Sequence, residues 1–288
     1  MVEKKKNNNK NTILILAIIG VIVIYFLYNL LSGFELPGET IAIIPIKGEI
    51  SGQGPSQGLF LVGPSASRIV DNIRQADQDP SISGIYLEID SPGGTPVASH
   101  EIVKAVKRAE KPTVAVIKDV GASGAYWVAS AADHVIADEL SLTGSVGVQG
   151  SYIGFYGLMD RYNVTYERLA GGEYKDAGSP FREMSNEERN ALEIKIDQMH
   201  DFFLRDVNEL RNLTPEAYEE VSTGIFFIGL EAYDIGLVDE LGGDIEAVNH
   251  FEELLNQSVT TRRIEESPGL FSSLMGLSQD RDNTLLLR

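Results

Sequence analysis

Two glycine-rich turns each follow a predicted strand and could present chemical groups to a reacting carbonyl. Residues 90–95 read DSPGGT, and their two adjacent glycines allow a sharp turn with exposed N–H groups where a helix begins. Residues 121–127 read GASGAYW and place Ser123 among small residues that a substrate could approach. The hydrolase elbow G-x-S-x-G fails by one residue, because Ala125 stands where glycine is required. A serine nucleophile is one interpretation, and close packing of a helix on a sheet is the other.

A serine nucleophile needs a general base, and the histidines are poor candidates. The chain holds four of them: His100, His134, His200 and His250. None lies in a glycine-rich turn, and no two have the H-x-x-x-H spacing of metal ligands, so no metal site is predicted. Each is more simply read as a structural or exposed side chain. Lysine is the other available base, provided that burial lowers its pKa.

One lysine stands apart from the others. The lysines that follow residue 39 are Lys47, Lys104, Lys107, Lys111, Lys118, Lys175 and Lys195. Lys175 lies in residues 171–180 (GGEYKDAGSP), a loop with little helical or strand character. A lone loop lysine is usually a surface charge, so the residues by themselves leave the identity of the base open.

The elements that must hold these residues alternate between strand and helix. Strands are predicted at residues 41–46, 84–89, 113–117, 134–137 and 146–148. Helices are predicted at residues 67–75, 97–109, 122–132, 185–211, 215–220, 230–233 and 245–254. The third strand is expected to end at Lys118 and Asp119. Apolar strands that alternate with helices predict an α/β fold with a mainly parallel sheet covered by helices.

Composition excludes several classes of function. The 288 residues suffice for one large domain or two small ones, and 43% of them are hydrophobic, enough for a packed core. The chain has no cysteine, which excludes disulfide scaffolds, thiolate metal sites and a cysteine nucleophile. A formal net charge of −18 argues against a nucleic-acid partner, because an acidic surface repels phosphates.

The N-terminus is predicted to be a membrane anchor. Residues 12–31 carry no charge, and as a helix they would rise about 30 Å, the thickness of a hydrocarbon core. A buried core helix would show a polar stripe, and a cleaved signal peptide would have a shorter apolar region. Because lysines precede the run and acids follow it, the N-terminus should be cytoplasmic and the rest extracytoplasmic.

Several motifs, in this order, resemble those of the SppA-type signal peptide peptidases of the short, single-repeat form. They are residues 90–94 (DSPGG), 121–126 (GASGAY), 142–147 (LTGSVG), 172–180 (GEYKDAGSP) and 229–243 (GLEAYDIGLVDELGG). The likeness runs from about Ile41 to Leu255, and the spacing from Ser123 to Lys175 also fits. The segment 124–127 (GAYW) departs mildly from the Gly-Gly-Tyr-Tyr that the family often has.

The resemblance implies a Clp-protease/crotonase-like fold of repeated βαβ units and a Ser–Lys dyad. Ser123 would be the nucleophile, Lys175 the general base, and Ser145 the residue whose hydroxyl orients the lysine amine. The backbone donors of the oxyanion hole would come from Gly93 or Gly94 and from Gly124. Tyr126 and Trp127 could add an apolar wall, or only pack the helix on the sheet. No cofactor or metal is implied.

The function expected is that of a membrane-anchored serine endopeptidase acting on extended apolar peptides, such as leftover signal peptides. The family implies a homo-oligomeric ring, of which an octamer is one form, with the Ser and Lys of one site on neighbouring subunits. The predicted divisions are a cytoplasmic N-terminus (1–11), a transmembrane anchor (12–31), a linker (32–39), the protease domain (40–255) and a C-terminal tail (256–288).

Two other functions remain alternatives. A crotonase-type acyl-CoA enzyme would share the Gly-Gly turn, but it would need a catalytic carboxylate and basic contacts to CoA. The acidic composition, the apolar N-terminus and Lys175 argue against it. A non-catalytic membrane scaffold would not need Ser123, Ser145 and Lys175 together.

Overall fold

A computed structural model describes residues 39–52 and 65–264, which belong to one compact unit beginning at Glu39. The predicted anchor at residues 12–31 lies outside the described residues. Within the described ranges, no helix combines the length and the hydropathy that a membrane crossing requires.

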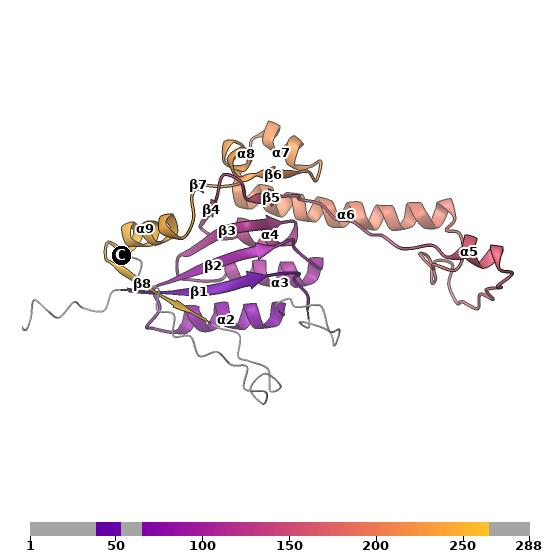
Figure 1. Cartoon of the computed structure of the whole chain (residues 1–288), viewed down its shortest axis with the longest axis horizontal. Helices are drawn as coiled ribbons and strands as arrows, with labels where there is room; N and C mark the ends of the chain where they lie inside the picture. Colours follow the sequence, from indigo (N-terminus) through magenta and orange to yellow (C-terminus); the bar gives the residue numbers. More distant parts are fainter. Residues whose placement is uncertain (1–38, 53–64, 265–288) are drawn as a thin grey trace, which may run out of the picture. The chain divides into compact units, whose positions relative to one another are not determined.

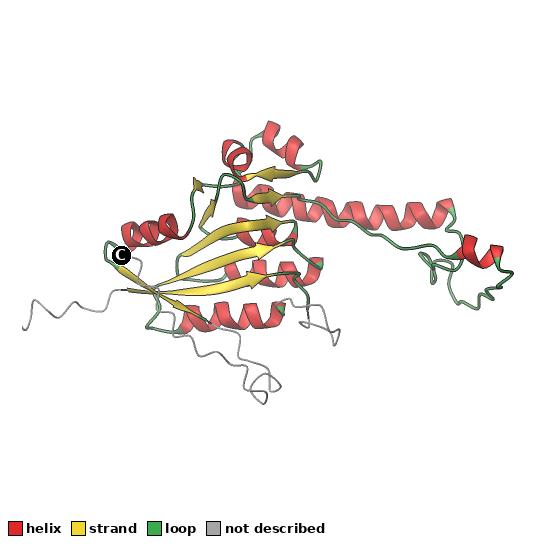
Figure 2. Ribbon diagram, viewed as in Figure 1, coloured by secondary structure: helices red, strands yellow, loops and turns green. Residues whose placement is uncertain are grey.

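A mostly parallel sheet forms the centre of this unit (Figures 1 and 2). Its strands are β1 (Glu39–Lys47), β2 (Gly84–Ser91), β3 (Thr113–Ala122), β4 (His134–Ala137), β5 (Leu142–Gly144), β6 (Phe226–Ile228), β7 (Glu240–Leu241) and β8 (Val259–Arg263). The order is β6-β5-β3-β2-β1-β8, and β4 lies beside β3 and carries β7 on its other edge. Only the β5–β6 pair is antiparallel among these strands. The predicted α/β class with a mainly parallel sheet is confirmed.

Helices cover both faces of the sheet because its central strands are apolar on both faces. The helices are α2 (Ala66–Gln78), α3 (Pro96–Val106), α4 (Gly124–Ser130), α5 (Tyr156–Arg161), α6 (Asn186–Arg211), α7 (Pro215–Val221), α8 (Gly229–Asp234) and α9 (Asp244–Leu255). In β1, Ile44 and Ile46 join the core under α2 and α3, whereas Ile41 and Ile43 join a second core that includes Phe251 of α9. This alternation follows from the two-residue period of a strand.

The long helix α6 was predicted within one residue of its observed start, and a capping box explains why it begins there. The backbone N–H of Glu188 donates to Ser185 Oγ at 3.2 Å, and the N–H of Ser185 donates to Glu188 Oε2 at 3.0 Å. The helix ends at Arg211, and the next residue, Asn212, adopts a left-handed conformation with φ +51°.

Two predictions around the third strand were wrong. β3 does not end at Lys118 and Asp119 but continues to Ala122, because its last residues pair with β5. The strand predicted at residues 146–148 is absent, and residues 142–144 pair instead. The polar residues Lys118 and Asp119 suggested that β3 ends at Ile117. Backbone pairing with β5 instead carries the strand five residues further, to Ala122.

β8 was not predicted and lies within the segment assigned to the C-terminal tail. It pairs in parallel with β1, from Glu39 opposite Val259 to Ile43 opposite Arg263. Arg263 donates two hydrogen bonds to Glu88 of β2, at 2.7 and 2.8 Å, and Lys47 lies 3.0 Å from the same carboxylate. The hydrogen bonds from Arg263 are the main reason that the pKa of Glu88 is lowered to about 2.

Arg263→Gln should lower the free energy of unfolding by about 1–3 kcal/mol at neutral pH, because it removes the main partner of a buried carboxylate. The contribution of Glu88 is complete above its ordinary pKa of 4.5 and is lost as the pH falls toward about 2. The difference between the variant and the wild type should therefore shrink below pH 4.5. Urea titrations at several pH values measure this difference.

Arg262→Gln is the matched control. Arg262 pairs with Asp79, but the two side chains are 52% and 36% exposed, so its loss should cost less than about 1 kcal/mol. Equal losses of unfolding free energy in the two variants would show that the pairing of Arg263 with Glu88 does not hold β8 in place.

Candidate active site

Ser123 lies where β3 ends and α4 begins, in an unusual backbone conformation. Its φ is +53° and its ψ is −125°, a region that residues with a Cβ seldom adopt. Its N–H donates to the carbonyl oxygen of Gly144 at 2.8 Å, so the pairing of β5 with β3 fixes the turn. Ser123 is half-buried. Strained positions of this kind gather at functional sites, which makes Ser123 the leading nucleophile candidate.

The two glycine-rich turns, distant in sequence, lie against each other. Gly93 has a φ of +96°, and a Cβ added to it would lie 2.7 Å from Gly124 N and 3.0 Å from Ser123 Cβ. A Cβ added to Gly94 would lie 1.9 Å from the carbonyl oxygen of Ile50. A side chain at Gly93 would separate the two turns, and one at Gly94 would push the first turn away from the backbone of Ile50, so both positions require glycine.

The hydrogen bonds distinguish the two glycines of the first turn. The N–H of Gly93 donates to Ser91 Oγ at 3.1 Å. The N–H groups of Gly94 and Gly124 have no protein acceptor among the described residues. The candidate oxyanion donors are therefore Gly94 and Gly124, a choice that the sequence alone left open.

A cleft of about 880 Å³ opens beside Ser123. Its glycine turns supply Gly93, Gly94 and Gly124. Its other walls are largely apolar and include Val97, Trp127, Met199, Phe202 and Phe203. Such a surface suits an uncharged, extended ligand better than a charged one.

Trp127 anchors an aromatic cluster along this cleft. Its ring stacks on Phe203 at 4.6 Å and on His100 at 5.0 Å between centroids, and its indole N–H donates to Asp206 at 2.7 Å. Burial lowers the pKa of His100, which favours the neutral imidazole. Tyr126 is wholly buried and donates to the carbonyl of Leu237. Of the two aromatic residues after the serine, only Trp127 therefore forms part of the wall.

Lys175 does not lie at the cleft that contains Ser123. It is exposed, in a turn of the segment 150–184, here called the arm, which Figure 1 shows at the far end of α6 from the sheet. The neighbouring Asp176 is linked through Arg182 to Glu188 at the start of α6. The cleft lies near a later part of the same helix, where Phe203 contacts Trp127. Glu188 and Phe203 are separated by about 22 Å of helix. One chain thus holds the two predicted dyad residues apart.

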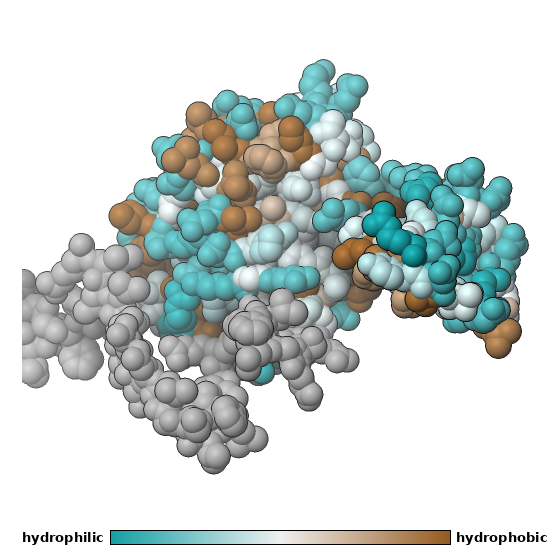
Figure 3. Space-filling model, turned by 45° about the vertical axis from the view of Figure 1, so that its right-hand side comes forward, coloured by the Kyte–Doolittle hydropathy of each residue, from teal (hydrophilic) through white to brown (hydrophobic). Residues whose placement is uncertain are grey.

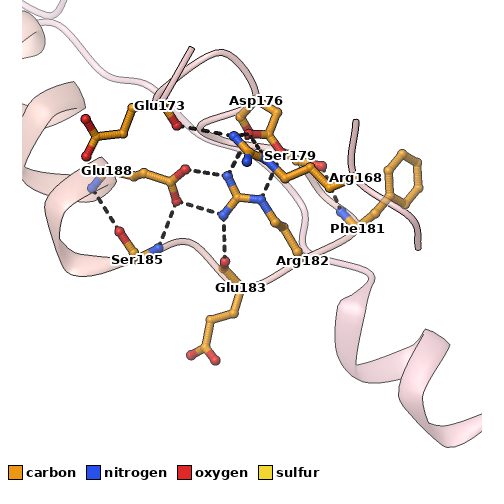
Figure 4. A network of polar contacts seen from close by, with 9 residues as sticks. All are labelled: Arg168, Glu173, Asp176, Ser179, Phe181, Arg182, Glu183, Ser185 and Glu188. Atoms are coloured by element: carbon orange, nitrogen blue, oxygen red, sulfur yellow. Dashed lines mark hydrogen bonds and ion pairs between the residues drawn. The ribbon is translucent and has the colours of Figure 1, made fainter. Parts of the chain in front are cut away.

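An ion-pair network fixes the turn that carries Lys175 (Figure 4). Arg182 donates to Asp176 at 2.9 and 3.0 Å and to Glu188, and Arg168 donates to Asp176 at 2.7 Å. The Arg182 hydrogen bonds hold the pKa of Asp176 well below its usual range. The turn is thereby joined to the start of α6.

Ser145 is close to Ser123 through the sheet register. It follows Gly144, the residue whose carbonyl accepts the N–H of Ser123, and its own N–H donates to the carbonyl of Ile225 at 2.9 Å. Like Ser123 it has a positive φ, of +51°, and it is half-buried. The structure therefore brings Ser123, Ser145 and the glycine turns together, but not Lys175.

One lysine at the cleft was not singled out by the sequence. Lys195 of α6 lines the cleft, is exposed, and donates to Gln198 at 3.1 Å. It looked like an ordinary charge on an amphipathic helix, so no sequence signal distinguished it.

Comparison with known proteins decides the family. Residues 105–258 match the sequence profile described as Peptidase family S49. The chain belongs to peptidase family S49. The predicted kinship with SppA-type peptidases is confirmed, and the S49 chain is a protease.

Relatives of this S49 protease come from distant organisms. It is 32% identical to a protein named as a protease (MJ0651) in Methanocaldococcus jannaschii, over 90% of this chain and 86% of that protein. It is 28% identical to an Enterococcus faecium protein provisionally named signal peptide peptidase SppA, over 83% of this chain and 71% of that one. It is 30% identical to Protease 4 of Haemophilus influenzae, over 80% of this chain but only 37% of that protein.

Three residues of the S49 chain could together face a metal ion, far from Ser123. His134, Glu240 and His250 have ligand atoms within 4.8 Å of one another. His134 Nε2 already lies 3.0 Å from Glu240, and the two imidazole rings stack at 3.9 Å and 12°. Parallel rings cannot both aim a lone pair at one ion without turning. The cluster lies at the opposite end of β3 from Ser123, because His134 pairs with Val114 near the start of that strand.

Gly94→Ala should destabilise the S49 protease by more than about 2 kcal/mol and abolish cleavage, because the new Cβ meets backbone that cannot move away. Gly157→Ala is the control, since nothing lies within 4 Å of a Cβ added there. Its stability should stay within about 0.5 kcal/mol of wild type. Thermal unfolding and peptide hydrolysis measure the two effects; a stable, active Gly94→Ala protein would contradict the tight turn.

Proposed function

We propose that this S49 protease is a serine endopeptidase in which Ser123 is the nucleophile and a lysine, Lys175, is the general base. The observation that carries the proposal is the meeting of the two glycine turns. It sets the half-buried Ser123 beside two N–H groups, of Gly94 and Gly124, that have no protein acceptor among the described residues. A nucleophile next to prearranged donors is what acyl transfer requires.

In the proposed reaction, Ser123 Oγ attacks the carbonyl carbon of a peptide. The electron pair of the C=O bond moves onto its oxygen, where the N–H groups of Gly94 and Gly124 stabilise the charge. The neutral amine of Lys175 takes the serine proton and passes it to the departing amine. Water then hydrolyses the acyl-enzyme, with the same lysine as base.

We propose that the lysine of each site comes from a neighbouring subunit of a homo-oligomeric ring, of which an octamer is one form. Within one chain, Lys175 and Ser123 belong to regions separated by about 22 Å of α6. Figure 3 shows some brown residues at the arm among mostly hydrophilic ones. The arm exposes many aliphatic and aromatic side chains. They are Tyr152, Ile153, Phe155, Tyr156, Leu158, Tyr162, Val164, Tyr166, Leu169, Tyr174 and Phe181. A second subunit would cover such a surface.

Ser145 is proposed to orient the incoming lysine amine. Its hydroxyl makes no hydrogen bond to another described residue, and its backbone is held beside that of Ser123 by β5. A hydroxyl can accept from an ammonium or donate to a neutral amine, so it can guide the lysine in both protonation states.

The proposed substrates are extended apolar peptides, including leftover signal peptides. The apolar walls of the cleft support this class, and so does the name of the Enterococcus faecium relative. We further propose that residues 12–31 anchor the chain in the cell membrane with its N-terminus cytoplasmic and its protease domain outside. The uncharged run and the lysines before it support this orientation. The pairing of β3 with both β4 and β5 is compatible with the Clp-protease/crotonase-like arrangement.

A mixture of two inactive variants should recover activity if sites are shared between subunits. Ser123→Ala and Lys175→Ala are each expected to be inactive. Rings assembled from equal amounts of both should have about a quarter of their sites intact, each pairing one subunit's serine with the next subunit's lysine. The measurement is hydrolysis of an internally quenched apolar peptide after co-expression.

The control replaces Lys175→Ala with the double variant Ser123→Ala/Lys175→Ala, and its mixture with Ser123→Ala should stay inactive. A mixture of the two single variants that stays inactive although mixed oligomers form would argue against shared sites.

The rate should rise with pH between about 6 and 9, because lysine is a base only when neutral and ordinarily titrates near 10.4. Lys175→Arg should be nearly inactive, since guanidinium does not give up its proton. Lys195→Arg is the control at the cleft and should keep most of the activity. A rate that does not change with pH would contradict a lysine base. Loss of activity in Lys195→Arg but not in Lys175→Arg would show that Lys175 is not the base.

Cut sites mapped by mass spectrometry in a peptide library should be enriched in Ala, Leu, Val or Phe. Met199→Glu should reduce this enrichment, because it sets a charge in the wall at a position that is 42% exposed and so tolerates it. Leu192→Glu, at a 39% exposed position of the same helix outside the cleft, should leave the pattern unchanged. A strong demand for Lys, Arg or Asp at the cut would contradict the apolar cleft.

A further inference from the structure

Ser99 of α3 has a buried hydroxyl that no described residue satisfies. The residue is wholly buried, and its Oγ is one of two buried side-chain polar atoms without a hydrogen-bond partner in the described part of the chain. Ser99 is nonetheless among the residues that line the cleft of Ser123. Ser99 thus packs into the wall of the proposed catalytic site and not into a remote part of the core.

The hydroxyl packs against Gly124, one of the two proposed oxyanion donors. A Cβ added to Gly124 would come within 2.2 Å of Ser99 Oγ and 3.4 Å of Gly94 N. The Oγ therefore occupies the space beside the Gly124 Cα, where a side chain at 124 would have to go. Glycine at position 124 leaves room for this hydroxyl as well as for the approach of the two turns.

Packing alone does not explain a serine at this position. A buried hydroxyl without a partner destabilises a protein, and alanine would fill nearly the same volume and favour the helix. Helical serines usually resolve this by donating to a carbonyl one turn back. Ser130 of α4 does so, donating to the carbonyl of Trp127 at 2.8 Å, whereas the Ser99 hydroxyl has no partner among the described residues.

We propose that Ser99 is a third donor of the oxyanion hole, a role that rests on Ser123 being the nucleophile. As Ser123 Oγ forms its bond to the carbonyl carbon, the C=O electron pair becomes a lone pair on oxygen. The Ser99 O–H donates to that oxygen together with the N–H groups of Gly94 and Gly124. No proton leaves Ser99, and the bond is lost again when the carbonyl re-forms and the amine departs.

Ser99→Ala, made in the full-length chain in detergent micelles, separates this role from a structural one. Removal of one oxyanion donor typically costs about 10²–10³ in kcat, so kcat should fall at least about tenfold with KM little changed. Affinity for a peptide boronic acid, whose serine adduct is tetrahedral and anionic, should fall in parallel. The melting temperature should stay the same or rise, because an unpartnered buried hydroxyl has been removed.

Ser130→Ala is the matched control, since it removes a buried helical hydroxyl that has a partner. It should lower the melting temperature and keep kcat near wild type. Ser99→Cys keeps the size of the side chain but weakens the donor, so its kcat should lie between those of wild type and Ser99→Ala.

Wild-type kcat in Ser99→Ala would overturn the proposal. A second pattern would also overturn it: Ser99→Ala loses both melting temperature and activity, while Ser99→Cys keeps full activity. That pattern would show that the serine acts only through packing. Failure of the underlying function is distinguishable, since Ser123→Ala would then remain active and no boronate adduct would form on Ser123. An inactive Ser123→Ala with an unaffected Ser99→Ala would reject only the third donor.

Discussion

The close approach of two backbone turns is the constraint on which the candidate site depends. Gly93 reaches Ser123 and Gly124 only because it has no side chain where the turns touch, and Gly94 packs in the same way against the backbone of Ile50. The same approach brings two N–H groups beside the serine, and the buried Ser99 hydroxyl packs against Gly124. Parallel pairing of β2 with β3 supports this arrangement, since both turns follow the carboxyl ends of neighbouring strands, where α/β proteins commonly bind their ligands.

The local strain at Ser123 is compensated by regular structure around it. β5 pairs with the last residues of β3 and accepts the N–H of Ser123, which holds the positive φ in place. The segment after the serine is buried along its whole length, with Tyr126 tied to the carbonyl of Leu237. A strained residue persists when its surroundings determine its conformation this strongly.

The arm presents the opposite situation, because its residues are well connected to one another but not to the sheet. Arg182 ties the turn at Asp176 to Glu188, so the position of Lys175 follows the start of α6. The body of the unit instead contacts the later part of α6, through Phe203. A site that needs Lys175 beside Ser123 is therefore incomplete in a single chain, and we propose that another copy covers the apolar surface of the arm.

The sequence by itself determined the fold class, most helices and the small set of residues around Ser123, because hydrophobic periodicity and glycine-rich turns are local signals. It could not determine the full extent of β3 or the strand β8, since these depend on hydrogen bonds to segments distant in the chain. Nor did it show that the N–H of Gly93 is bonded to the Ser91 hydroxyl two residues earlier. It also gave no sign of the orphaned Ser99 hydroxyl, whose meaning comes only from its neighbours in space. The tertiary structure decided these points because pairing, burial and the distance between Ser123 and Lys175 are properties of the packed chain and not of its local residue order.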